Sequence, residues 1–191
     1  MEVKELTELV NKVKLQQPGA IDLLYDIFKN QAYSTAVFLT GNEEDAKDVV
    51  QDTFVTVYVQ INKLKKSEAF IAWFYRILTN NARSILKRHK KELIQKENEF
   101  RQESLDVHED FADKILQQEE HNHLRKMINR MDEKYRTVIV LHYFNEFSVG
   151  EIADILDCRE GTVKSRLFKA RKILEKSLSS QRTYKKEGER P

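Results

Sequence analysis

The most constraining feature of this 191-residue sequence is a long stretch without glycine or proline. Neither residue occurs between Asn42 and Val149, and the whole chain has only five glycines and two prolines. β-Sandwiches and repeated βαβ units need frequent turns, for which glycine and proline are the usual residues. Lysine, glutamate, leucine and glutamine, which favour helices, are frequent instead. The sequence therefore predicts an all-α protein.

Cysteine content and hydropathy narrow the class of protein further. The single cysteine excludes an internal disulfide framework and a CxxC zinc site. No run approaches the roughly 18 apolar residues that indicate a transmembrane helix. The first residues lack the basic and then apolar pattern of a signal peptide. We therefore expect a soluble cytoplasmic protein.

Charge is distributed in three blocks, although the net charge is only +2. Residues 63–91 hold nine basic residues and one acidic residue, and residues 159–186 hold ten basic and two acidic residues. Between these blocks, residues 92–120 hold three basic and ten acidic residues and lack a regular apolar pattern. Segregated basic segments are typical of nucleic-acid binding, although many charged runs are only solvated helix faces.

Apolar periodicity divides the chain into two small helical domains. We expect the first domain over residues 1–91 and the second over residues 121–178. The acidic residues 92–120 are expected to link them, and residues 179–191 are expected to form a disordered tail.

The second domain contains the pattern of a helix-turn-helix motif. Ser148 and Glu151 have the spacing of a capping box, which opens a short helix. A turn at Asp157 separates this helix from a second one, expected over about 160–178. Two short helices joined by a tight turn, the second of them basic, predict a DNA-binding helix-turn-helix.

The second helix of this motif is amphipathic with a basic outer face. At 100° per residue its apolar positions form one buried stripe, made by Val163, Leu167, Ala170 and Leu174. The outer face and its flanks carry Lys164, Ser165, Arg166, Phe168, Lys169, Arg171 and Lys172. In a major groove, lysine contacts phosphate or guanine and an aromatic ring contacts a thymine methyl group. An ordinary amphipathic helix is the alternative, but the preceding capped helix and turn favour DNA binding.

The helix expected after Asn42 has two contrasting faces. Gly41 is expected to end the preceding helix, and Asn42 is expected to cap this one. The predicted core face carries Ala46, Val49, Val50, Phe54, Val57, Tyr58 and Ile61. The opposite face carries Asp48, Gln51, Asp52, Val55 and Val59. Carboxylates beside exposed valines indicate either a protein-binding face or a solvated one, and the spacing alone does not decide.

The basic segment 63–91 combines cations with aromatic and amide side chains. A basic loop with Lys63, Lys65 and Lys66 precedes a helix expected over about 68–87. That helix carries Trp73, Arg76, Asn80 and Arg83. Bases of single-stranded nucleic acid stack on aromatic rings or enter pockets. Packing in a protein core explains Trp73 equally well, so both roles stay open.

Three segments resemble a known family. Residues 39–54 (LTGNEEDAKDVVQDTF) and 73–80 (WFYRILTN) resemble region 2 of a bacterial RNA polymerase sigma factor. Residues 148–174, which contain EIA at 151–153 and GTVKSRL at 161–167, resemble region 4. No segment resembles region 1.1 or region 3. This two-domain plan is similar to the extracytoplasmic function (ECF) class of the sigma-70 family.

The resemblance implies a sigma factor that binds core RNA polymerase and directs promoter-specific transcription initiation. The face with Asp48, Gln51 and Asp52 corresponds to the family's surface for the β′ clamp helices, and the β subunit is a further implied partner. Residues 63–83 correspond to the segment that opens and reads the −10 element, with Asn80 beside the pocket for a flipped base. The helix over about 160–178 corresponds to the −35 reader.

The resemblance also implies regulation. It implies an anti-sigma factor, often membrane-anchored, that holds the protein inactive until a stress signal arrives. It implies promoter DNA as a partner, and no cofactor or small-molecule substrate. One departure is Asp157, where the family often has glycine, but aspartate tolerates the left-handed backbone conformation better than most residues.

A metal site or an enzyme has little support. His121 and His123 point about 200° apart on a helix and cannot chelate one metal together. His142 and Cys158 are expected in the core of the second domain. The sequence contains no glycine-rich phosphate loop and no common hydrolase motif. We therefore expect no metal and no catalytic residues.

Two other functions remain as alternatives to a sigma factor. An autonomous DNA-binding regulator needs only the helix-turn-helix, so it does not explain the basic segment 63–91 or the acidic face with Asp48. A helical protein–protein module needs neither basic segment. Binding to duplex DNA without polymerase would favour the regulator, and binding insensitive to salt would favour the module.

Overall fold

The computed structural model describes residues 2–99 and 124–187 of the chain. Within these ranges every regular element is helical, which confirms the predicted all-α class. The N-terminal unit, residues 2–99, contains α1 (Val3–Lys14), α2 (Ala20–Thr40), α3 (Glu43–Gln60) and α4 (Phe70–Glu99). The C-terminal unit, residues 124–187, contains a helical segment at 124–129, then α6 (Glu133–Ile139), a π-helix (Val140–Phe144), α7 (Val149–Leu156) and α8 (Glu160–Glu187).

The boundary between α2 and α3 is set by two adjacent residues, as the sequence predicts. Gly41 ends α2 with φ of 79°, in the left-handed region, and its N–H donates to the carbonyl of Val37. The side chain of Asn42 then accepts from the backbone N–H groups of Glu44 at 2.7 Å and Asp45 at 3.1 Å. Both expectations for this boundary are confirmed.

The core of the N-terminal unit is aromatic. Phe70 and Phe74 of α4 are fully buried, and both rings lie within 6 Å of the ring of Phe28 on α2. α1 adds a further apolar face, formed by Leu6, Leu9, Val10 and Val13. These four residues have helical spacing, so the sequence pattern predicts α1 as well, although our sequence analysis did not single it out.

Three apolar residues of α2 and α3 face solvent, and one of them, Tyr58, was expected in the core. Tyr58 on α3 is 58% exposed, and Leu23 and Ile27 on α2 are 54% and 39% exposed. Tyr58 and Leu23 each neighbour a fully buried residue, Val57 and Leu24. Because consecutive helical residues point 100° apart, only one residue of each pair faces the core.

The helix-turn-helix forms as predicted. The hydroxyl group of Ser148 accepts from the N–H of Glu151, and the carboxylate of Glu151 accepts from the N–H of Ser148 at 2.8 Å. Asp157 ends α7 with φ of 50° and ψ of 54°, the left-handed conformation expected for this position. On α8, Val163, Leu167 and Ala170 are buried and Leu174 is partly buried.

A π-helix changes the apolar face that precedes this motif. The N–H of Asn145 donates to the carbonyl of Val140, five residues earlier, instead of four. Val140 is therefore fully buried, whereas His142 is only half-buried and Phe144 is 39% exposed. A π-turn shifts residues away from regular α-helical spacing, so Phe144 lies at the edge of the apolar face rather than within it.

Two helices extend beyond their expected ends. α4 continues to Glu99, into the segment expected to be the acidic linker. α8 continues to Glu187, into the segment expected to be a disordered tail. His121, His123 and the linker beyond residue 99 lie outside the described residues. Within the described ranges no group of His, Cys, Asp and Glu side chains is placed to hold a metal ion.

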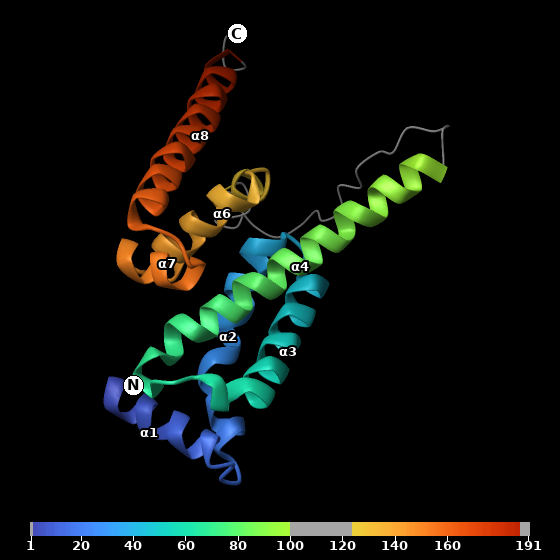
Figure 1. The fold of residues 1–191 in the computed structure, drawn as a ribbon. Coiled ribbons are helices and arrows are strands. Elements are labelled where there is room, and N and C mark those ends of the chain that lie inside the picture. Colours follow the sequence, from blue (N-terminus) through green and yellow to red (C-terminus); the bar gives the residue numbers. More distant parts are fainter. Residues whose placement is uncertain (1, 100–123, 188–191) are drawn as a thin grey trace.

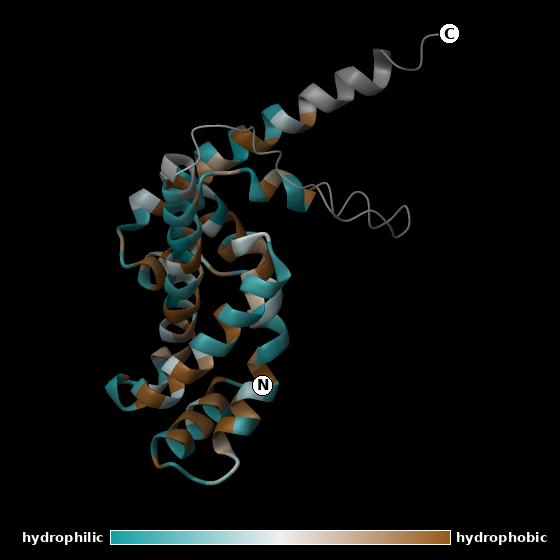
Figure 2. Cartoon of the chain, turned by 90° about the vertical axis from the view of Figure 1, so that its right-hand side faces the viewer, coloured by the Kyte–Doolittle hydropathy of each residue, from teal (hydrophilic) through white to brown (hydrophobic). Residues whose placement is uncertain are grey.

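The two units pack against each other and share one continuous apolar cluster. α7 lies beside α4, and α6 and the π-helix contact α2 (Figure 1). α8 projects away from the N-terminal helices (Figure 1), and hydrophilic residues occur on the part of the C-terminal helix that is coloured in Figure 2. The fold therefore leaves the outer faces of α3 and α8 uncovered and covers part of α4.

Candidate nucleic-acid and protein interfaces

The outer face of α8 is a basic surface open to solvent. Six of the seven predicted residues are exposed: Lys164, Ser165, Phe168, Lys169, Arg171 and Lys172. Arg166, on the flank, is half-buried. The Phe168 ring is 58% exposed, and the ammonium group of Lys172 lies 4.7 Å from its centroid. The structure thus brings the predicted −35 residues together on one accessible face.

The helix-turn-helix holds this face by its opposite side. The fully buried Val163 and Ala170 of α8, and Ile152 of α7, belong to the shared core. The hydroxyl group of Ser165 donates to the carbonyl of Thr162 at 2.9 Å, so it does not project as a free donor. A helix fixed in this way presents its N-terminal turns outward, as a major-groove reader does.

The outer face of α3 combines carboxylates with apolar side chains. Asp48, Gln51, Asp52 and Val55 are all exposed, as predicted. Val59 and Tyr58 extend this face and are 69% and 58% exposed. The sequence analysis placed Tyr58 on the core face of this helix and therefore left it out of the exposed face. Its position seven residues after Gln51 places it on the same side of the helix, so the helical period carried the necessary signal.

A groove of about 510 Å³ lies between α2 and α3 beside this face. Its lining includes Tyr25, Tyr33 and Phe54, and it reaches Gln51 and Val55 of the exposed α3 face. Two lysines also line it, and each pairs with an acid: hydrogen bonds to Asp26 and Glu44 raise the pKa of Lys29 and Lys47 respectively. The exposed face of α3 is therefore one wall of a wider polar and aromatic surface.

The predicted −10 residues divide into three groups. Lys63, Lys65, Lys66 and Asn80 are exposed. Trp73 is half-buried and packs on the core beside Phe70, with 6.2 Å between ring centroids. Arg76 and Arg83 contact the C-terminal unit: Arg76 donates to the carbonyl of Asp154, and Arg83 Nε lies 2.5 Å from Glu133 Oε1. The structure thus leaves the lysines and Asn80 accessible and engages the two arginines.

Helix α1 anchors the loop that carries the three lysines. The ammonium group of Lys14 donates to the carbonyl of Leu64 at 2.7 Å and to the hydroxyl group of Ser67 at 3.0 Å. Ser67 in turn donates to the Asn11 side chain at 2.6 Å. Lys63, Lys65 and Lys66 lie around these anchor points, so the basic loop is held in place although its charges face solvent.

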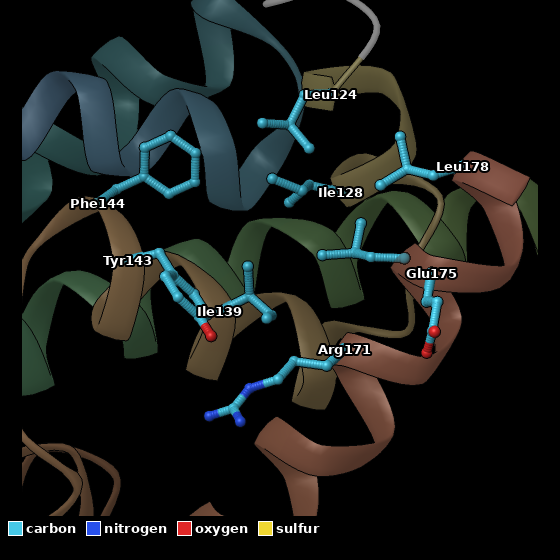
Figure 3. A pocket seen from close by; sticks show the side chains of 9 residues that line it. Leu124, Ile128, Ile139, Tyr143, Phe144, Arg171, Glu175 and Leu178 are labelled. Carbon is cyan, nitrogen blue, oxygen red and sulfur yellow. The ribbon is translucent and has the colours of Figure 1, made fainter.

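An apolar groove lies in the C-terminal unit, between α8 and the helices before it. It has a volume of about 620 Å³, and its walls come from Leu124, Ile128, Ile139, Tyr143, Phe144, Leu174 and Leu178. Arg171 and Glu175 of α8 also line it (Figure 3). The sequence analysis did not identify this groove, because it depends on how α8 lies against the helical segment at 124–129.

Comparisons with known proteins match both units. The family model described as sigma-70 region 2 matches residues 24–92, and the one described as sigma-70, region 4 matches residues 121–174. The ECF RNA polymerase sigma factor SigW of Bacillus subtilis is 31% identical over 176 residues, covering 88% of this chain and 94% of that protein. The ECF RNA polymerase sigma-E factor of Haemophilus influenzae is 31% identical over 189 residues, covering 92% and 97%.

Solved structures show the same fold. CnrH, in complex with the cytosolic domain of CnrY, has a TM-score of 0.70 at 23% identity and covers 92% of this chain and 97% of that one. The sigma factor RpoE of Bartonella quintana, in complex with the anti-sigma factor NepR, has a TM-score of 0.66 at 24% identity and covers 84% and 98%.

A basic helix-turn-helix and an exposed carboxylate-bearing helix face in one chain fit the class of proteins that bind both DNA and a protein partner. The family matches make this specific: the chain belongs to the sigma-70 family of RNA polymerase sigma factors, in the ECF class. Sigma factors are transcription regulators that direct RNA polymerase to promoters. Within the described residues, no helix is both long enough and apolar enough to cross a membrane.

Proposed function

We propose that this sigma factor divides polymerase binding and promoter binding among three surfaces of one chain. The outer face of α3, with Asp48, Gln51, Asp52 and Val55, binds the β′ clamp helices of core RNA polymerase. The outer face of α8 reads the −35 element as a duplex. Residues 63–83 bind the −10 element as a single strand. The protein acts by binding in the cytoplasm and catalyses no reaction of its own.

One observation carries this proposal: an exposed protein-type surface and an exposed DNA-type surface occur in the same chain. The α3 face joins two carboxylates to Val55, Tyr58 and Val59, all exposed. An aromatic and apolar centre with polar residues around it is typical of a protein interface. The α8 face joins cations to an exposed phenylalanine and suits base edges and phosphates. A regulator that binds DNA alone needs only the second surface.

We further propose that two protein partners use the remaining surfaces. The apolar groove lined by Leu124, Ile128 and Leu178 offers a docking site for the β subunit of the polymerase. An anti-sigma factor holds the protein inactive until a stress signal arrives. The solved complex of the Bartonella quintana sigma factor with the anti-sigma factor NepR supports an anti-sigma factor as a partner.

The test is run-off transcription with purified core polymerase on genomic fragments. The proposal predicts defined transcripts that require both this protein and core polymerase, from start sites that share two sequence elements. The matched control is the Asp52→Arg variant, which keeps both DNA surfaces. Tight, specific binding to duplex fragments without core polymerase, together with no transcripts when core is added, would instead identify an autonomous regulator.

A further inference from the structure

The basic loop between α3 and α4, residues 61–69, has a regular pattern of burial. It begins and ends with a short 3-10 helix. Ile61, Leu64 and Ser67 are buried, and they stand three residues apart, which is the period of a 3-10 turn. The three lysines of the loop occupy positions between them and are exposed. Burial of every third residue therefore leaves all three lysine side chains on the solvent side.

The polar member of this buried set, Ser67, finds its hydrogen-bond partners on α1. Its hydroxyl group accepts from the ammonium group of Lys14 at 3.0 Å and donates to the Asn11 side chain at 2.6 Å. The same ammonium group donates to the Leu64 carbonyl at 2.7 Å. A buried polar group without a partner destabilises the conformation that holds it, so these bonds favour the present form of the loop over alternatives.

Helix α1 therefore has two sides with different contacts. Its apolar residues fill the core, whereas Asn11 and Lys14, three positions apart and hence on one side of the helix, reach the loop. α1 lies beside the connection from α3 to α4 (Figure 1). The whole helix precedes residues 24–92, which the region 2 family model matches, so that match does not account for these contacts.

We propose that α1 is a positioning element of the −10 surface: Asn11 and Lys14 fix the basic loop, so that its lysines stand in place before a single strand binds. The inference rests on the proposed function, which assigns Lys63, Lys65 and Lys66 to single-stranded −10 DNA. A loop that is already ordered loses little conformational entropy on binding, whereas the strand itself must order an unanchored loop. Lys14 directs two N–H groups of its ammonium to the loop and acts on DNA only through it.

The test removes the anchor and keeps the three lysines of the loop. Lys14→Met deletes the ammonium group and preserves an unbranched side chain. The matched control is Lys12→Met, which makes the same change at an exposed position in the same last turn of α1. Fluorescence anisotropy with a labelled single-stranded DNA of mixed sequence measures binding by the full chain. Lys14→Met should bind about tenfold more weakly, because apparent affinity scales with the fraction of molecules whose loop is ordered. Lys12→Met should match the wild type.

The salt dependence of binding distinguishes positioning from direct contact with DNA. For single strands, each phosphate contact contributes about 0.7 to the slope of log affinity against log salt concentration. Lys65→Met, which removes a proposed contact, should lower the slope by about that amount. Lys14→Met should leave the slope unchanged, because the loop lysines still reach the strand once the loop has become ordered.

Loop order and a conservative replacement provide two further readouts. The N–H groups of Leu64 and Ala69 bond within the loop, to the carbonyls of Ile61 and Lys66. Both N–H groups should exchange with solvent faster in Lys14→Met and at the wild-type rate in Lys12→Met. Lys14→Arg should restore strand binding and slow exchange, because a guanidinium group can donate to the same carbonyl and hydroxyl groups.

Ser67→Ala tests the anchor from the loop side. The change removes the hydroxyl group that joins Lys14 and Asn11, so it should also weaken strand binding at an unchanged salt slope. Combined with Lys14→Met it should weaken binding little further, because residues of one hydrogen-bond network are not additive. Losses that multiply would show two independent effects and contradict a single anchor.

The remaining outcomes separate this inference from the proposed function. Equal strand affinity of Lys14→Met and Lys12→Met, beside a wild type that binds, would overturn the positioning role of α1. A salt slope lowered in Lys14→Met as far as in Lys65→Met would overturn it as well, by showing that Lys14 contacts DNA. A wild type that binds no single strand would overturn the −10 assignment and the inference with it, while the hydrogen-exchange result would still show whether α1 orders the loop.

Discussion

The two helices that we propose contact DNA, α8 and α4, lie in opposite environments. On α8, the predicted −35 contacts Lys164, Phe168 and Lys169 are exposed, while the other side of the helix fills the core. On α4, by contrast, Arg76 and Arg83 contact the C-terminal unit. The proposed −35 surface is therefore open to solvent, whereas two residues of the proposed −10 surface are engaged by the C-terminal unit.

This difference shows how far one helical period can predict function. α8 packs against the core through a single apolar stripe. The helical period alone therefore separates the buried residues of α8 from its exposed residues. α4 meets partners on more than one side: Phe70 and Phe74 fill the N-terminal core, while Arg76 and Arg83 reach the other unit. Four predictions test the comparison, taken from the largest expected effect to the smallest.

The largest effect is expected from Val163→Asp, which places a charge in the fully buried stripe of α8. An unpaired charge at such a site should lower the free energy of unfolding by about 3–5 kcal/mol. Thermal unfolding followed by circular dichroism measures this loss. The control is Lys164→Asp at the next, exposed position, which should leave the midpoint nearly unchanged. Equal midpoints for the two variants would show that the helical phase is wrong.

Asp52→Arg tests whether the exposed face of α3 is a protein interface. Reversing one charge of a desolvated pair should weaken binding to core polymerase by about 2–5 kcal/mol and abolish co-purification. The helix content should stay unchanged because Asp52 is exposed. Glu8→Arg, an exposed reversal on α1, is the control and should co-purify normally. Normal co-purification of Asp52→Arg would remove this face from the proposal.

Alkaline pH tests the buried side of the interface between the units. Burial raises the pKa of Tyr75 from 10.0 to about 12, so the folded state favours the neutral phenol. The stabilisation is complete below pH 10 and is lost as the pH rises from 10 to 12, by up to about 3 kcal/mol. Denaturant unfolding of wild type and Tyr75→Phe across this range measures it. The variant should lack that decrease, and parallel curves for the two proteins would contradict the burial of this hydroxyl group.

The smallest effects separate base contacts from phosphate contacts on α8. Lys169→Ala should cost about 1–3 kcal/mol at the matched −35 site and relax the base preference there. Ser165→Ala should relax it as well, because the hydroxyl oxygen can accept from a base while the group donates to the Thr162 carbonyl. Lys172→Ala should weaken all sites equally and lower the salt slope by about one. Fluorescence anisotropy over a −35 library compares them. If Lys172→Ala altered the base preference and the other two variants did not, the assignment of the face would be reversed.

The sequence predicts those features that depend on a few neighbouring residues. Gly41 with Asn42, Ser148 with Glu151, and Asp157 all take the predicted conformations because each forms its contacts within one turn of helix. Exposure is predicted well wherever a helix packs on one side only, as on α8. Tyr58 shows the remaining ambiguity, since a residue at the edge of an apolar stripe can face either way.

Features that depend on the packing of the two units could not be predicted in the same way. The π-helix over Val140–Phe144 ends in a bond from the N–H of Asn145 to the carbonyl of Val140, and no residue type there specifies it. The contacts of Arg136 with Leu39 and of Asn145 with Thr35 join residues about a hundred positions apart. Local sequence patterns do not predict contacts between such distant residues. The contacts of Arg76 and Arg83 with the C-terminal unit are therefore known only from the structure.

The most direct test of the central claim concerns the form in which −10 DNA is bound. Permanganate footprinting of −10 thymines, with core polymerase and either wild type or Asn80→Ala, reports strand opening at the promoter. Asn80 is exposed on α4, so its truncation should leave the fold and initial duplex binding intact. The account predicts reactive −10 thymines with the wild type and far fewer with Asn80→Ala, at equal closed-complex binding. Equal reactivity with both proteins would contradict the assignment of this surface to single-stranded −10 DNA.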